Sequence, residues 1–401
     1  MPHYCFIPGS HPELSLAELH SVVSGTFKDG GNYFLIDPLE ELRAPELQFR
    51  LGGTVKIAVI DQSIQFSELP SIFDINNLLG KYFAQSEDKI TFGASIYGKK
   101  DNQLIKQIRR LGMQAKKELH ANAFTARFVI NDTGILSSVV VTKNHLIERG
   151  AEIIILNDGK KLHIGKTLTV QDFEEYSNRD YGRPARDTKR GILPPKVAQI
   201  MINLAEQKKD SVIIDPFCGT GTILQEALRA GYQNLTGSDI SDKAIKDTQR
   251  NLDWYAKQKE IKNTVKLFQK DIRALSDEIN QESVDGIITE PYLGPPLLRK
   301  PGSEKLHRIM AELELLYNET FIVFERILKS QGKAVISLPF FKLEESEQHI
   351  NIEKCLNGTS LQIVVLGENK SLHYFRTDQI VGREIFILQK NADPALRDQR
   401  R

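Results

Sequence analysis

The chain has 401 residues, of which 26% are charged and 40% hydrophobic, as in soluble globular proteins. This length exceeds one ordinary hydrophobic core and predicts two or three domains. No run of about 18 apolar residues occurs, and the start lacks a basic region followed by a long apolar one, so we expect a cytoplasmic protein that is neither secreted nor membrane-spanning.

The cysteines and histidines give no pattern of metal ligands. Cys5, Cys218 and Cys355 lie far apart, without a CxxC pair or a Cys/His cluster, which fits a reducing compartment. The histidines of the first segment, at positions 3, 11 and 20, share no metal-ligand spacing and are better interpreted as surface or core residues. The sequence therefore predicts no metal site.

The net charge of +1 hides an uneven distribution. Residues 1–90 hold 6 basic and 12 acidic side chains, a balance of −6, whereas residues 91–170 hold 13 and 6, a balance of +7. A concentrated basic segment is typical of proteins that hold a polyanion by its phosphates. An ordinary solvated basic face, docked on the acidic first segment, is the alternative that charge alone leaves open.

Residues 1–85 are predicted to form a small α+β module without a catalytic role. Pro12–Ser24 has helical spacing of its apolar residues, while Tyr33–Ile36 and Thr54–Ile60 have the composition of strands. We expect this module to hold the next one in place.

Residues 86–170 are predicted to form a second α+β unit. The expected order is strand 90–95, helix 103–117, strand 125–129, a β-rich run at 136–141 and strand 153–156. Several basic side chains of the helix are spaced so that they share part of one surface. They are Lys106, Arg109, Arg110 and Lys117. Such a unit suits an RNA backbone, which is recognised by charge and shape.

Residues 171–190 are polar and rich in arginine and tyrosine, and we expect a linker without regular structure. Pro194 and Pro195 then open a helix that runs through Met201 and Leu204. A rigid interdomain strap and a lip of a ligand pocket are equally good interpretations of this segment.

From residue 211 onward strands alternate with helices, which predicts a largely parallel sheet covered on both faces. The expected strands are 211–216, 234–239, 264–269, 284–289, 331–338, 361–366 and 380–389, and the expected helices lie near 221–230, 241–258, 303–329 and 343–356. The last two strands leave little room for a helix between them, so we expect a hairpin that adds one antiparallel strand.

The strongest ligand motif follows the first of these strands. The apolar run ends at Asp215, and a turn with Gly219 and Gly221 leads into a helix whose first N–H groups face the same space. Leu224 stands where a dinucleotide fingerprint has its third glycine, and no GKS or GKT is present, which argues against NAD and nucleoside triphosphates. A ligand without phosphates, such as S-adenosylmethionine, fits this loop.

Two more strand ends carry carboxylates. Asp239 stands where a ribose diol needs an acceptor, and Asp271 suits an adenine amino group. Each alone is better interpreted as a helix cap or loop residue. In series after the glycine loop, the ligand interpretation is favoured.

The fourth strand, 284–288, leads into Thr289, Glu290, Pro291 and Tyr292. In a doubly wound sheet, ligands bind beyond the carboxyl ends of the strands near the switch point. We therefore expect this segment to face the cofactor, with Pro291 stiffening the backbone and Tyr292 stacking on a flat ring.

These motifs, in this order, resemble the THUMP-containing tRNA guanine-N2 methyltransferases, which modify the guanosine at position ten. The matching stretches are DPFCGTGT, SDIS, KDIRAL, TEPYLGP, GILPPK and RTDQIVGREI, with FGASIYG, LSSVVVTKN and IGKTLTVQDFEEYSNRDYGRPARD upstream. The resemblance implies a ferredoxin-like module at 1–85, a THUMP RNA-binding domain at 86–170, a linker at 171–190 and, at 191–401, a class I S-adenosylmethionine-dependent methyltransferase with a doubly wound, seven-stranded mixed sheet.

The resemblance also implies the ligands and their contacts. The cofactor contacts are Asp215, Phe217, Gly219 and Gly221 around the methionine part, Asp239 and Ile240 at the ribose, and Asp271 and Ile272 at the adenine. The THUMP domain is expected to bind the acceptor end of tRNA, while the linker sets the distance to the target base. Some relatives need a small activating subunit; that requirement and the oligomeric state cannot be read from the sequence.

One motif departs from the resemblance. Amino-group methyltransferases of this kind usually have Asp or Asn, two prolines and an aromatic residue where this chain has Thr289, Glu290, Pro291 and Tyr292. The amine of guanine is a poor nucleophile, because its lone pair is shared with the ring. An acceptor side chain and a backbone carbonyl normally take its hydrogens and point the lone pair at the sulfonium methyl.

Our hypothesis is that Glu290 holds and deprotonates the amine, that Thr289 accepts only weakly, and that Tyr292 stacks on the base during a single displacement. The alternative is that Glu290 pairs with an arginine, such as Arg183 or Arg186, and only orders the loop.

Two other functions remain open at this point. The same fold could methylate DNA or a protein amide, or the altered motif could leave a protein that binds RNA and S-adenosylmethionine without catalysis. The number of methyl groups transferred and the target nucleoside are not readable from the sequence.

Overall fold

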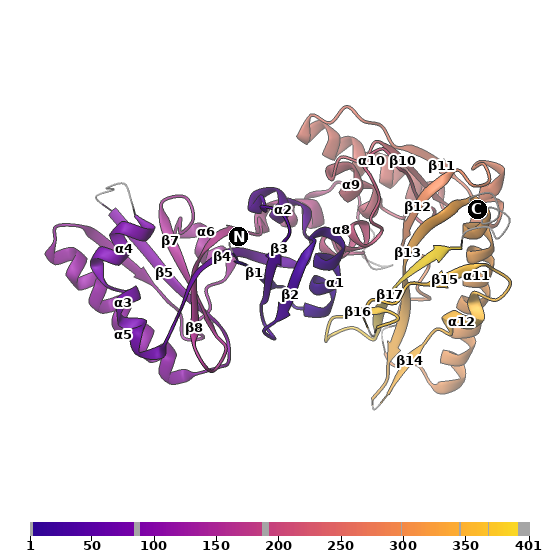
Figure 1. Cartoon of the computed structure of the whole chain (residues 1–401). Helices are drawn as coiled ribbons and strands as arrows, with labels where there is room; N and C mark the ends of the chain where they lie inside the picture. Colours follow the sequence, from indigo (N-terminus) through magenta and orange to yellow (C-terminus); the bar gives the residue numbers. More distant parts are fainter. Residues whose placement is uncertain are drawn as a thin grey trace, which may run out of the picture. The chain divides into compact units, whose positions relative to one another are not determined.

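The computed structural model of the chain (Figure 1) describes residues 3–83, 89–186, 192–297, 299–344, 346–367 and 369–391. Contacts divide the chain into two compact units, Met1–Leu16 with Val23–Glu175 and Ala17–Val22 with Tyr176–Arg401. The domain boundaries expected at 85/86 and 190/191 lie outside the described residues. Among the residues described, every helix is too short or too polar to cross a bilayer.

The described residues of the first unit form one eight-stranded sheet in the order β2-β3-β1-β4-β8-β7-β5-β6. Its strands are β1 His3–Pro8, β2 Gly25–Asp29, β3 Phe34–Pro38, β4 Thr54–Ile64, β5 Lys89–Gly98, β6 Thr125–Val129, β7 Gly150–Asn157 and β8 Leu162–Val170. Antiparallel pairing of β4 with β8 joins the two predicted α+β regions into one sheet. Their division into separate domains stays a prediction.

Helix α5, Asn102–Ala121, carries the predicted basic surface of this unit. Its start is capped by Asp101, whose side chain accepts hydrogen bonds from two backbone N–H groups. Leu104, Ile108 and Leu119 are among the apolar residues that it buries. The four basic residues named above are exposed on the remaining surface.

The other helices of the N-terminal region are short. They are α1 Pro12–Val22, α2 Ala44–Arg50, α3 Leu69–Ile72, α4 Ile75–Tyr82 and α6 Ser138–Lys143, with a 3-10 turn η1 at Phe66–Glu68. The strand-like prediction for 136–141 is wrong, because the hydroxyl of Ser137 accepts from the N–H of Val140 and caps α6. This short helix buries Val141 against Leu136 and Leu146.

The expected linker also has regular structure, so the prediction of an irregular segment is wrong. Helix α7, Phe173–Ser177, continues as a π-helical turn η2, Asn178–Gly182. Two large side chains anchor this turn to the second unit. The Tyr176 hydroxyl donates to Gln199 Oε1 at 2.6 Å, and Arg179 Nε lies 2.6 Å from Glu226 Oε1, both ends of that ion pair being fully buried.

In the second unit, the main path of the sheet has the order β11-β10-β9-β12-β13-β17-β15, with β14 paired to β13 and β16 to β17. The strands are β9 Val212–Asp215, β10 Asn234–Asp239, β11 Lys266–Gln269, β12 Val284–Thr289, β13 Leu328–Lys342, β14 Glu347–His349, β15 Leu361–Ile363, β16 Leu372–Tyr374 and β17 Val381–Lys390. Strands β9 to β13 are parallel, and β17 runs antiparallel between β13 and β15. The predicted hairpin of the last two strands is confirmed.

Helices cover both faces of this sheet, α9 and α10 on one side and α11 and α12 on the other (Figure 1). They are α8 Pro195–Leu204, α9 Thr222–Arg229, α10 Asp242–Lys259, α11 Ser303–Ile327 and α12 Ile352–Cys355, with a 3-10 turn η3 at Ile272–Asp277. Helix α11 buries a row that includes Leu313, Tyr317 and Phe324 in a core shared with β12 and β13. This burial fixes the carboxyl ends of the central strands.

The helix predicted at 343–356 is wrong over most of its length. Strand β13 continues to Lys342, and β14 pairs with it antiparallel, placing His349 opposite Phe340. A helix begins only at Ile352, where the side chain of Asn351 accepts from the N–H of Lys354 and caps it.

Candidate functional site: a cavity at the carboxyl ends of the parallel strands

The glycine loop joins β9 to α9, and its backbone requires glycine at two positions. Gly219 has φ 55° and Gly221 φ 81°, both in the left-handed region. A Cβ on Gly221 would lie 2.8 Å from Cγ2 of Thr248, so a larger residue there would require the Thr248 side chain to move. The loop therefore keeps its close approach to the neighbouring helix only with glycine at position 221.

Backbone groups of the loop are held by the second strand and by α10. The Gly219 N–H donates to Asp239 Oδ2 at 3.1 Å, and the Thr248 hydroxyl donates to the Gly219 carbonyl at 2.9 Å. The other carboxylate oxygen of Asp239 accepts from the Ser241 N–H at 2.9 Å. Asp239 thus links the first two strand ends, while it also lines the cavity beside them.

A cavity of about 680 Å³ lies at these strand ends. It brings together nine of the twelve residues that the sequence singled out: Phe217, Gly219, Asp239, Ile240, Asp271, Ile272, Glu290, Pro291 and Tyr292. Ile240 and Tyr292 are 65% and 51% exposed, so the cavity has an apolar and aromatic wall open to a ligand. Asp271 caps η3 by accepting from the Arg273 N–H at 2.9 Å.

A smaller cavity of about 120 Å³ lies on the other side of the loop, toward α9 and α10. Asp215, Cys218 and Thr222 line it, and Gly219 and Glu290 line both cavities. The glycine loop and the end of β12 are therefore neighbours, as the sequence analysis requires.

Asp215 is buried between these strand ends. Its Oδ1 accepts from the Thr289 hydroxyl at 2.7 Å and from the Phe217 N–H at 3.2 Å. Burial raises the pKa of Asp215 to about 7, although those two hydrogen bonds lower it and the charges of Asp239 and Glu290 raise it further. The carboxyl group can therefore change its charge near neutral pH.

Thr289 does not reach either cavity. Its side chain is fully buried and its hydroxyl is committed to Asp215. The structure thus contradicts the expectation that Thr289 acts as a weak acceptor for an incoming amine.

Glu290 forms an ion pair with Arg383 of β17. Arg383 Nε donates to Oε1 at 2.6 Å and Nη2 donates to Oε2 at 3.0 Å, so both carboxylate oxygens accept from one guanidinium. The hydroxyl of Ser337, on the intervening strand β13, also points to Oε1 at 3.3 Å. The neighbouring charge of Glu290 raises the pKa of Arg383, although burial alone would lower it.

The sequence-based alternative paired Glu290 with an arginine such as Arg183 or Arg186. An arginine does pair with Glu290, but it is Arg383. Arg183 instead donates to the Thr222 hydroxyl at 2.7 Å, and Arg186 lies over the ring of Tyr181, 4.7 Å from its centroid. Arg383 was missed because it lies 93 residues from Glu290. The order of strands β12, β13 and β17 is what brings the two together.

A third cavity, of about 430 Å³, adjoins the first and is lined by arginines as well as by Asp180 and Asp378. Leu293, Gly294 and Pro296 line both cavities. Three arginines line the third one, Arg186, Arg376 and Arg383, together with Tyr181. The sequence analysis did not single out Arg376, which lies in the loop between β16 and β17.

A family model described as the RMKL-like methyltransferase domain, UPF0020, matches residues 183–342. A tRNA (guanine(10)-N2)-dimethyltransferase of Methanocaldococcus jannaschii is 32% identical over 152 residues, which cover 37% of this chain and 43% of that protein. A probable tRNA (guanine(10)-N2)-dimethyltransferase of Methanothermococcus thermolithotrophicus is 30% identical over 162 residues, which cover 40% of this chain and 96% of that sequence. The chain thus spans less than half of the first relative and nearly all of the second.

Solved structures resemble the chain over almost its whole length. TrmN from Thermus thermophilus covers 97% of this chain and 100% of its own, with a TM-score of 0.55 and 15% identity. A possible methylase from Clostridium difficile 630 covers 98% of this chain and 99% of its own, with a TM-score of 0.54 and 14% identity. These likenesses concern the fold alone, and they confirm the predicted class I methyltransferase architecture after an N-terminal α/β region.

Proposed function

Since this chain belongs to the UPF0020 family of RMKL-like methyltransferase domains, we propose that it transfers a methyl group from S-adenosylmethionine to the exocyclic N2 of a guanosine in tRNA, the guanosine at position ten. The observation that carries this proposal is that Gly219 and Glu290 line one cavity. A cofactor on the glycine loop and an amine at the end of β12 can meet there.

In this proposal the cofactor lies across the first three strand ends. Asp239 accepts from the ribose hydroxyls beside the exposed Ile240, and Asp271 with Ile272 contacts the adenine. Gly219 and Phe217 would border the methionine part, with Gly221 setting the backbone of the loop, and the charge of Asp215, in the adjoining smaller cavity, would act on the sulfonium. When bound, the cofactor supplies an electrophilic methyl group.

Glu290 is proposed to orient the amine of guanine. Oε1 already accepts from Arg383 and Ser337, and Oε2 accepts from Arg383 alone, so Oε2 has a second lone pair that can accept an N–H of the substrate. Removing a proton before transfer would weaken the contacts with Arg383. We therefore assign Glu290 the holding part of its predicted role. The bond from the methyl carbon to sulfur would break as the bond to N2 forms, and the methylated nitrogen would then lose its extra proton to water.

Pro291 and Tyr292 complete this wall. Pro291 is buried and fixes the backbone after Glu290, while the Tyr317 hydroxyl donates to the Tyr292 carbonyl at 2.7 Å. This contact fixes the backbone from which the exposed Tyr292 ring projects, so the ring is placed to stack on the target base.

The RNA is proposed to enter through the third cavity. Arg186 and Arg376 suit the phosphates that flank a target nucleotide, and Tyr181 offers a second aromatic surface. Residues 86–170 are proposed to be the THUMP domain, with the exposed basic side chains of α5 on the tRNA backbone. The U6 snRNA (guanine-N(2))-methyltransferase THUMPD2 of Bos taurus is 29% identical to this chain over 163 residues. This likeness supports the same amine as the target and makes U6 snRNA the alternative substrate to test.

The test is to incubate the full chain with methyl-labelled S-adenosylmethionine and separate samples of unmodified tRNA, U6 snRNA, DNA and protein extract. Label in tRNA that a nucleoside digest identifies as N2-methylguanosine or its dimethyl form supports the proposal. A matched tRNA with adenosine at position ten should remain unlabelled. The digest also decides between one and two methyl groups.

The other outcomes separate the competing functions. Label confined to snRNA, DNA or protein contradicts the tRNA assignment but is compatible with the fold and with the proposed cofactor. Saturable cofactor binding without label in any sample, even after addition of a cell extract that supplies an activating subunit, supports a non-catalytic RNA-binding protein instead.

A further inference from the structure

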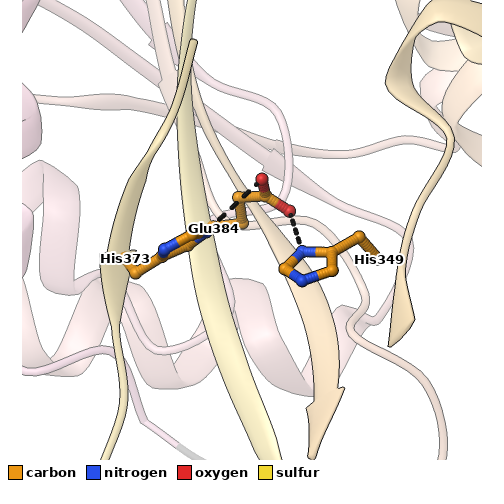
Figure 2. Close-up of side chains that lie close together, drawn as sticks. All are labelled: His349, His373 and Glu384. Atoms are coloured by element: carbon orange, nitrogen blue, oxygen red, sulfur yellow. Dashed lines mark hydrogen bonds and ion pairs between the residues drawn. The ribbon is translucent and has the colours of Figure 1, made fainter. Parts of the chain in front are cut away.

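Two histidines and one glutamate meet on the sheet of the second unit, outside the three cavities described above. His349 lies at the end of β14, His373 in the middle of β16 and Glu384 on β17 (Figure 2). Strands β13 and β17 pair with each other, β14 pairs with β13, and β16 pairs with β17. Three side chains distant in sequence are thus brought to one place by four adjacent strands.

The side chains point toward one another. His349 Nδ1 lies 2.9 Å from Glu384 Oε2, and His373 Nε2 lies 3.5 Å from Glu384 Oε1. One ligand atom from each residue lies within 4.8 Å of the other two. Tetrahedral zinc with ligands at about 2.0–2.2 Å places its ligand atoms about 3.3–3.6 Å apart. Small rotations of the two imidazole rings would therefore bring the three ligand atoms to these separations.

Surrounding groups orient these three side chains as they do in metal sites. The second ring nitrogen of His349, Nε2, lies 3.7 Å from Glu347 Oε2, an ion-pair distance and not a hydrogen bond, so this carboxylate is placed to orient the ring when a metal binds. The Ser371 hydroxyl donates to Glu384 Oε1 at 2.7 Å. The ring of Phe340 is stacked on that of His349, with the centroids 5.3 Å apart, and lies equally close to His373.

We propose that His349, His373 and Glu384 bind one Zn²⁺ ion. Two imidazoles and a carboxylate are a common zinc ligand set, and they leave a fourth position for water. Because both histidines are partly exposed, an ion can enter from solvent. The site does not depend on methyl transfer.

The ion would act as a cross-link in this unit. Strands β14 and β16 have three residues each and few ladder hydrogen bonds, so coordination would fasten both to the long strand β17. The loop from 375 to 380 follows β16 and carries Arg376 to the wall of the third cavity. Binding of zinc is therefore expected to order that part of the cavity wall.

The test uses the full chain, freed of any purification tag and dialysed against a chelator. Titration with ZnCl₂, followed by calorimetry, is expected to show saturable uptake of one equivalent. Co²⁺ in its place should give the visible absorption of a tetrahedral site. His349→Ala, His373→Ala and Glu384→Gln should each lose stoichiometric uptake, and Glu347→Gln should bind about 10–100-fold more weakly.

His307→Ala is the matched control, since it removes an exposed histidine from α11 in the same unit, and it should bind zinc as the natural chain does. Hydrogen exchange in residues 372–380 should slow on addition of zinc in the natural chain and in this control, but not in His373→Ala. Failure of the natural chain to take up one equivalent, or unchanged uptake by His373→Ala, would overturn the proposal. Circular dichroism of each variant distinguishes a lost ligand from a lost fold.

Discussion

The large cavity has a cofactor half, lined by Gly219, Asp239 and Asp271, and an amine half, lined by Glu290, Pro291 and Tyr292. The two halves are held by different kinds of contact. In the cofactor half, contacts connect residues that are close in sequence: Asp271 accepts from the N–H two positions later, and Gly219 donates to a carboxylate 20 positions later. In the amine half, Glu290 is held by Arg383, 93 positions away. Only the second kind of contact requires the whole sheet to be assembled.

This difference predicts how a substitution in each half affects cofactor binding, catalysis and folding. The glycine loop depends on its own backbone conformation, on Asp239 at the end of β10 and on Thr248 of α10, so a change in the loop should alter mainly cofactor binding. The Glu290–Arg383 pair couples strand β12 to β17, so a change there should affect folding and catalysis together. The predictions below separate these effects.

The largest effect is expected from Arg383→Met. Removing one partner of a buried ion pair leaves the other charge unpaired and costs about 3–5 kcal/mol of stability. Methyl transfer should also be lost, because Glu290 is no longer held. Chemical denaturation with activity assays at a temperature where the variant is folded would measure both.

The double variant Glu290→Gln with Arg383→Met sharpens this result. It removes the unpaired charge, so it should be more stable than Arg383→Met alone, while methyl transfer stays low. A double variant as unstable as the single one would show that Arg383 acts through packing and not through Glu290. A fully active double variant would contradict the proposed orientation of the amine.

Gly221→Ala is expected to weaken cofactor binding by about 100-fold, because it combines left-handed strain of about 1–2 kcal/mol with the contact at Thr248. Gly231→Ala is the matched control. Gly231 has φ 86° but open space around its Cβ position, so that variant should lose some stability and bind the cofactor normally. Equal loss of cofactor affinity in both variants, measured by calorimetry, would contradict the role of the loop.

The sequence predicted most of the residues that the structure brings together at the cofactor half of the site, but not the hydrogen bond between Asp215 and Thr289, which are 74 positions apart. Strand ends at Asp215, Asp239 and Asp271 were predicted from an apolar run that stops at a carboxylate, and in a parallel sheet such ends lie at one edge. The turn at Gly219 and Gly221 could be predicted because the left-handed backbone conformation that requires glycine is a local property. The structure places these residues together, while their individual contacts with the cofactor stay predictions.

The amine half and the proposed zinc site could not be read in the same way. Arg383 faces Glu290, and His349 meets His373, only because β17 lies beside β13 and pairs with β16. No spacing in a single sequence reports such an arrangement. The two wrong helix–strand assignments have a local cause, since the capping side chains of Ser137 and Asn351 decide where α6 and α12 begin.

Tyr292→Ala is expected to have a moderate effect. Stacking of a base on an aromatic side chain contributes about 1–3 kcal/mol, so KM for tRNA should rise about tenfold or more, with cofactor affinity nearly unchanged. Tyr292→Phe retains the ring and should behave like the natural chain. A similar rise in KM for both variants in steady-state assays would assign the effect to the hydroxyl and not to stacking.

The last prediction concerns the charge of Asp215. Its pKa is about 7 in the folded chain and 3.8 in an unperturbed carboxyl group. Between about pH 4 and pH 7 the folded chain therefore retains a proton that the unfolded chain has lost, so this group lowers the free energy of unfolding as pH rises and has no further effect above pH 7. Asp215→Asn should remove that component from the pH dependence of chemical denaturation.

The same group should make cofactor binding depend on pH. S-adenosylmethionine is cationic at its sulfonium, so it favours the charged carboxylate, and its affinity should rise about tenfold between pH 6 and pH 8. Calorimetry at pH 6 in buffers of different ionisation enthalpy should detect a released proton, which Asp215→Asn would not release. An affinity that is constant over this range in the natural chain would mean that Asp215 lies too far from the sulfonium to respond to its charge.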